Sequence, residues 1–191
     1  MNPESQTSTE AKTPMNRLGV LILAARALLF LGLALPAGGA MAEPQTLQEE
    51  LVGTWTLVLV DNVLPDGSRV ELYGPHPQGL LMFDAQGRYS LQILRAGRAR
   101  FTSNDKSKGT PEENKAAVQG SNSHFGRYSV NEAERTVTFH IEHAFFPNWE
   151  GTEQKRTFTL TGDELKYTVP TPTTGGTATG EVVWKRARPS M

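Results

Sequence analysis

The sequence predicts an all-β, antiparallel fold of eight or nine short strands with one short helix, arranged as a closed barrel or as a sandwich. From residue 51 onward, short segments of alternating apolar and polar side chains recur at regular spacing, and Gly, Pro, Asn and Asp residues separate them. Only residues 110–120 in this part of the chain have the start and stop signals of a helix. A barrel of about eight strands is wide enough to hold one small ligand.

The segment that precedes these strands, residues 1–42, is expected to be a secretory signal. Arginines precede a short apolar run at residues 27–35, and Ala40-Met41-Ala42 has the small-residue pattern of a cleavage site. Cleavage there leaves one domain of residues 43–191. That domain is expected to be exported, either periplasmic or secreted, without a stable membrane anchor.

The alternative for this segment is an uncleaved N-terminal membrane anchor. Residues 18–35 are mostly apolar, but Arg26 interrupts them and leaves a core too short to span a bilayer comfortably. Met15 is an alternative start to Met1, and the sequence leaves both open.

The composition excludes several classes of protein. The chain has 19 Lys+Arg and 20 Asp+Glu, so it lacks the basic excess typical of a nucleic-acid partner. It has no cysteine, which excludes disulfides, thiol catalysis, thiolate metal sites and a lipid-anchored lipoprotein.

The first strand is predicted at residues 51–60, where side chains alternate. Gly53, Trp55 and Leu57 fall on one face, and Val58 and Val60 fall on the other. A tryptophan needs a large apolar cavity and a partner for its N–H, and the neighbouring glycine leaves room for another group to close over the ring. This strand is therefore expected to plug one end of a closed sheet.

Residues 80–84 and 88–94 form the clearest predicted hairpin, because Ala85-Gln86-Gly87 places glycine where a three-residue connection needs positive φ. One face of its second arm carries Tyr89, Leu91, Ile93 and Arg95. The helix at residues 110–120 is predicted from an N-cap threonine, a proline at the first position and a capping-box glutamate. The remaining strands are predicted at residues 69–73, 125–130, 136–143, 154–160, 164–169 and 181–186.

Five segments in this order resemble the lipocalin-like domain proteins of bacteria and fungi, a branch of the calycin barrels. The segments are Leu51-Val52-Gly53-Thr54-Trp55, Tyr73-Gly74-Pro75-His76-Pro77-Gln78-Gly79-Leu80-Leu81, Gly109-Thr110-Pro111-Glu112-Glu113, Phe125-Gly126-Arg127-Tyr128 and Phe146-Pro147-Asn148-Trp149-Glu150-Gly151-Thr152. The resemblance covers residues 51–186. It implies an up-and-down barrel with an interior pocket for a small, mostly apolar molecule, and it brings no agreed catalytic residues.

The resemblance also implies that the barrel floor is closed by Trp55 packing against Arg186 beside Gly53, as a cation–π pair. The side chains expected to face a ligand are Leu57, Tyr89, Leu91, Arg95, Tyr128, Phe139, His143 and Tyr167. Arg95 offers a planar fork to a carboxylate or enolate. The alternative is that the strand ends before Arg95, which is then simply solvated. His143 shares the apolar face of its strand and is interpreted as a hydrogen-bonded residue of the core or the pocket mouth.

No metal site or cofactor is expected. His140 and His143 are three residues apart on a predicted strand, which places them on opposite faces. The serine and acidic residues show no nucleophile elbow that would indicate Ser/His/Asp catalysis.

Three functions follow from this fold. The first is an exported carrier that binds or sequesters a small hydrophobic or amphipathic molecule inside the barrel. The second is a cyclase or isomerase that uses the same pocket, with Arg95 or His143 directing charge. The third is a barrel filled by its own side chains, with a structural or interaction role. An enzyme needs a titratable group within reach of its substrate, and a carrier does not.

Overall fold

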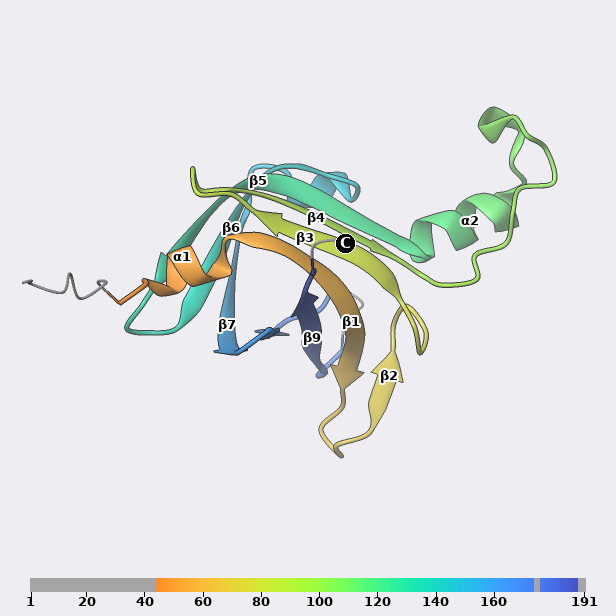
Figure 1. Cartoon of the computed structure of the whole chain (residues 1–191). Helices are drawn as coiled ribbons and strands as arrows, with labels where there is room; N and C mark the ends of the chain where they lie inside the picture. Colours follow the sequence, from red (N-terminus) through yellow and green to blue (C-terminus); the bar gives the residue numbers. More distant parts are fainter. Residues whose placement is uncertain (1–43, 174–175, 189–191) are drawn as a thin grey trace, which may run out of the picture. The chain divides into compact units, whose positions relative to one another are not determined.

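In the described residues, eight antiparallel strands close into a barrel and a short extra strand, β2 (Arg69–Glu71), pairs with the end of β1 (Figure 1). The computed structural model describes residues 44–173 and 176–188, within a unit that spans Glu43–Met191. The predicted signal, residues 1–42, lies outside the described residues. The barrel strands are β1 (Gly53–Val63), β3 (Gln78–Phe83), β4 (Arg88–Leu94), β5 (Ser121–Asn131), β6 (Thr136–Ala144), β7 (Glu153–Thr161), β8 (Glu164–Val169) and β9 (Thr179–Arg186).

The barrel is closed by pairing between its first and last strands. β1 pairs with β3, and each strand from β3 to β8 pairs with the next along the chain. β9 then pairs with β1 over most of its length, from Trp55 opposite Arg186 to Val63 opposite Thr179. This up-and-down order confirms the predicted all-β barrel and excludes the sandwich.

In the part of the chain that the structure describes, the strands are accompanied by two α-helices and two single 3₁₀ turns: α1 (Leu47–Leu51), α2 (Pro111–Gln119), η1 (Lys106–Lys108) and η2 (Pro147–Trp149). The sequence predicted α2 but missed α1. Both begin with a capping box, Thr46 with Glu49 and Thr110 with Glu113. None of the residues of α2 is buried, and Figure 1 shows this helix extending away from the barrel strands.

A bulge in β1 changes which side chains face the interior. Its register against β9 shifts between Leu57 and Leu59. Trp55 and Leu57 are buried, Val58 is 44% exposed, and Val60 is buried again. The prediction that Val58 and Val60 share a face was therefore wrong, because the extra residue of a bulge reverses the alternation that follows it.

The floor of the barrel is packed around Trp55. The indole Nε1–H of Trp55 donates to the carbonyl oxygen of Leu51 at 2.9 Å. The guanidinium carbon of Arg186 lies 4.2 Å from the centre of the Trp55 ring, and its nitrogens donate to the carbonyls of Val52 at 3.1 Å and Glu50 at 2.6 Å. Arg186 thus ties the end of β9 to the residues that lead into β1.

Gly53 makes room for this arginine. Its φ is +132°, and a Cβ at this position would lie 3.2 Å from Nη1 of Arg186. A larger residue would strain the backbone and press on the guanidinium.

Candidate ligand-binding site

The interior next to the second half of β1, where Val60 and Asn62 point inward, contains a cavity of about 450 Å³. Small-molecule sites usually have roughly 300–1,000 Å³. Strands β1 and β4 to β9 line it. The connecting segments contribute Leu72, Tyr73, Trp149 and residues 170–173.

The wall of the cavity is mainly apolar and aromatic. Leu91, Ile93 and Val182 line it and are buried. Phe139 also lines the cavity, and its ring is met edge-on by the rings of Tyr89 at 4.7 Å and Tyr167 at 6.1 Å. Such a wall suits a small, largely apolar ligand.

His124 is a buried polar side chain in this wall. Its Nδ1 lies 2.7 Å from the hydroxyl of Tyr89, and the ring of Trp149 meets it edge-on at 5.8 Å. Burial and, to a smaller extent, the positive charge of Arg156 together lower the pKa of His124 to about 3. His124 is therefore neutral at pH 7.

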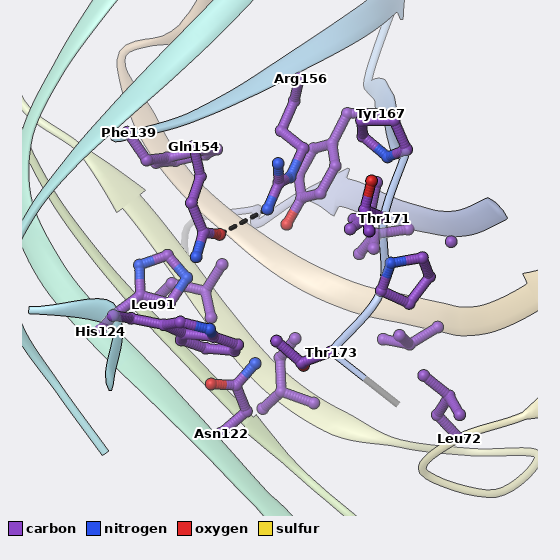
Figure 2. A pocket seen from close by; sticks show the side chains of 18 of the residues that line it. Leu72, Leu91, Asn122, His124, Phe139, Gln154, Arg156, Tyr167, Thr171 and Thr173 are labelled. Atoms are coloured by element: carbon purple, nitrogen blue, oxygen red, sulfur yellow. Dashed lines mark hydrogen bonds between the residues drawn. The ribbon is translucent and has the colours of Figure 1, made fainter. Parts of the chain in front are cut away.

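Arg156 brings a positive charge into the cavity. In β7, Gln154 and Arg156 alternate with exposed neighbours and share the inward face with buried Phe158. Figure 2 shows the guanidinium of Arg156 donating to the side-chain oxygen of Gln154. A second nitrogen of the same guanidinium donates to the carbonyl of Lys155 at 3.0 Å. Burial lowers the pKa of this guanidinium.

Two phenols lie near this charge. Tyr167 extends into the cavity beside Arg156 (Figure 2). Burial raises the pKa of Tyr167 to about 12, and burial also raises the pKa of Tyr89. Both phenols therefore keep their protons at pH 7 and supply hydrogen-bonding groups without a negative charge.

The structure brings some of the predicted ligand residues into the cavity and leaves others in the packed core. Leu91, Phe139 and Tyr167 line the cavity, and Tyr89 supports it through His124. Leu57 is a buried core residue. The hydroxyl of Tyr128 donates to the carbonyl of Asp84 at 2.9 Å, and its ring packs 4.6 Å from that of Phe83.

Arg95 and His143 lie outside the cavity. β4 ends at Leu94, and exposed Arg95 donates to the carbonyl of Leu72 at 2.5 Å. In β6 the register against β5 shifts, because Phe125 pairs with His143 while Gly126 pairs with Ile141. This bulge turns His143 outward, where its side chain is 66% exposed and lies 3.5 Å from Glu150.

His124 and Arg156 were not among the ligand-facing residues predicted from the sequence. The predicted strand began at Phe125 and left out His124, whereas β5 begins at Ser121. Extending the alternation back from Tyr128 would have placed His124 on the inward face. In β7, Arg156 lies two residues before apolar Phe158 and therefore on the same face, which carried the same signal.

The described residues contain no group of three histidine, aspartate or glutamate side chains placed to hold a metal ion. In the same part of the chain, no helix has the length and apolar character needed to cross a membrane.

The closed barrel and its apolar cavity define a small-molecule-binding β-barrel. A family model described as a lipocalin-like domain matches residues 52–187, and the chain belongs to this family. It is also similar to the 4'-hydroxy-3'-methoxypropiophenone carrier protein ppsC of Aspergillus oryzae (strain ATCC 42149 / RIB 40). The two are 29% identical over 89 residues, which cover 44% of this chain and 80% of that protein.

Proposed function

We propose that this domain carries or sequesters a small, mostly hydrophobic molecule inside its barrel. The observation that carries this proposal is the cavity of about 450 Å³, whose wall includes Leu91, Ile93, Phe139 and Val182. An interior filled by its own side chains would leave no such space, so the purely structural role is not favoured. The similar Aspergillus protein, described as the carrier of a small aromatic ketone, supports the same function.

Blocking the cavity tests this proposal. Leu91 lies in the wall, and its replacement by tryptophan fills part of the space. Leu80 lies on the neighbouring strand with its side chain 44% exposed, so Leu80→Trp adds the same group outside the barrel. The probe is the neutral dye N-phenyl-1-naphthylamine, whose fluorescence rises in an apolar site.

We expect the wild type and Leu80→Trp to bind the dye alike and Leu91→Trp to bind it at least roughly tenfold more weakly. Val182→Phe also fills part of the cavity but adds a smaller group. It replaces Leu91→Trp in the test if Leu91→Trp melts at a much lower temperature than the wild type. Equal binding by the wild type and a folded cavity-filling variant would show that the dye binds elsewhere and would contradict the proposal.

A second candidate is a cyclase or isomerase, and it is favoured by one observation. The cavity contains a titratable histidine, His124, together with the cation of Arg156. In this function, His124 and Arg156 would have the roles that were predicted from the sequence for His143 and Arg95. Incubating a bound, extracted ligand with the wild type and His124→Gln distinguishes the two functions, because an enzyme converts the ligand and a carrier returns it unchanged.

We further propose that the domain is exported after removal of residues 1–42. The supporting observation is the apolar run that leads to Ala40-Met41-Ala42. Mass spectrometry of the protein isolated from its native cells should find Glu43 at the N-terminus and the protein outside the cytoplasm. An intact N-terminus in a membrane fraction would instead support the anchor.

A further inference from the structure

Arg156 is a cation in the wall of a mainly apolar cavity. Two other charged residues, Glu153 and Lys155, also border the cavity. In β7 they alternate with the inward-facing residues and therefore lie on the outer face of the strand. Glu153 accepts from His140 at 2.9 Å, and Lys155 pairs with Glu134. Among the described lining residues, the guanidinium of Arg156 is therefore the one fixed charge that points inward.

No carboxylate in the described part of the chain forms an ion pair with Arg156. Its hydrogen-bond acceptors are the side-chain amide of Gln154 and the backbone carbonyl of Lys155, and both are neutral. A guanidinium has five N–H donors, so these bonds leave donors for another acceptor. Proteins generally pair a charge removed from water, because leaving it uncompensated costs free energy.

The titratable neighbours of Arg156 do not supply the missing negative charge. Tyr89 and Tyr167 are the phenols that interact with it, and burial raises the pKa of each. His124 is neutral at pH 7 and carries no negative charge in either state. The cavity thus has an excess positive charge at Arg156, while most of its remaining wall is apolar.

We propose, resting on the binding function above, that the ligand is a small apolar molecule with an ionised oxygen, a carboxylate or a phenolate, and that Arg156 binds this oxygen. The planar guanidinium matches such groups and forms stronger hydrogen bonds with them than with neutral oxygens. The phenol of Tyr167 lies beside Arg156 and is placed to donate to the same oxygen.

The test compares matched anionic and neutral probes on the full-length protein. The carboxylate pair is 2-naphthoate and 2-acetylnaphthalene, which have the same ring system and nearly the same shape. The phenolate pair is 4-nitrophenol, measured above its pKa, and its neutral methyl ether 4-nitroanisole. Isothermal titration calorimetry measures the affinity of each probe for the wild type, Arg156→Gln and Arg156→Lys. Arg127→Gln is the control, because Arg127 is an exposed arginine outside the cavity.

We expect the wild type to prefer the anion in at least one pair by roughly 10- to 100-fold, as a charge-assisted hydrogen bond supplies. Arg156→Gln should lose this preference and bind the neutral probe within about threefold of the wild type. Arg156→Lys should keep part of the preference, and Arg127→Gln should keep all of it. The better anion then identifies the carboxylate or the phenolate as the recognised group.

A structural role of Arg156 predicts different results. If Arg156 only supports the fold, Arg156→Gln should melt at a lower temperature and lose both probes of a pair equally, which would overturn the proposal. We expect instead an equal or higher melting temperature, because the substitution removes an uncompensated charge. Tight binding of the neutral probes without any preference for the anions would overturn this inference and leave the binding function intact. Failure of the wild type to bind any of the four probes would also overturn this inference, whereas the binding function itself is decided by the dye and the cavity-filling variants.

Discussion

Replacing Trp55 by alanine should strongly destabilise the barrel. Trp55 is fully buried, so the truncation should cost about 3–5 kcal/mol for a large aromatic side chain in a core. The same change removes the hydrogen bond to the carbonyl of Leu51 and the ring beneath Arg186, each worth about 1 kcal/mol. Because these contributions overlap, we expect a total loss of about 5 kcal/mol, a large part of the roughly 5–15 kcal/mol that stabilises a typical domain.

Urea unfolding followed by far-UV circular dichroism measures this loss without depending on tryptophan fluorescence. Trp55→Phe keeps a ring but removes the N–H donor, so its loss should be intermediate, about 2 kcal/mol. Val58→Ala is the matched control on the same strand, since Val58 is 44% exposed, and it should change stability by less than about 0.5 kcal/mol. A loss below about 1.5 kcal/mol for Trp55→Ala would refute the conclusion that Trp55 closes the floor.

Two further predictions concern β5. The pKa of His124 is lowered from 6.5 to about 3 in the folded state, so the unfolded chain binds a proton that the folded protein excludes. Stability should therefore fall as the pH drops from about 6.5 to 5, with a slope approaching 1.4 kcal/mol per pH unit, and urea titrations of His124→Asn should show a flatter profile. Gly126→Ala should cost about 2–3 kcal/mol, because its Cβ would lie 2.2 Å from the carbonyl oxygen of His140, whereas Ser123→Ala should be nearly neutral in the same assay.

The regular part of the fold could be predicted from local sequence patterns. The hairpin between β3 and β4 follows from apolar alternation and from Gly87, whose φ is +79°. The helix α2 follows from its capping box. These signals act within a few residues, so a single sequence contains them. The capping box of Thr46 and Glu49 shows that the signal for α1 was also present.

The bulges could not be predicted in the same way, because they depend on how two distant strands pair. The extra residue beside Leu57 is defined only by the register of β1 against β9, which is far away in the sequence. The shift in β6 is likewise defined against β5, where Gly126 allows the close approach of the neighbouring backbone. Each bulge reverses the inward alternation, which is why Val60 faces the interior and His143 does not.

The electrostatics of the cavity favour a carrier over an acid–base enzyme. A general base works best with a pKa near the pH at which it acts, and burial together with the charge of Arg156 moves the pKa of His124 to about 3. An anionic ligand on Arg156 would offset part of that charge, but the burial of His124 would remain and is the larger cause. Binding makes no such demand on His124, because a neutral imidazole hydrogen-bonded to Tyr89 provides a fixed, uncharged part of the wall. Because His124 is neutral as well as a weak base, the guanidinium of Arg156 is the dominant charge that faces the cavity.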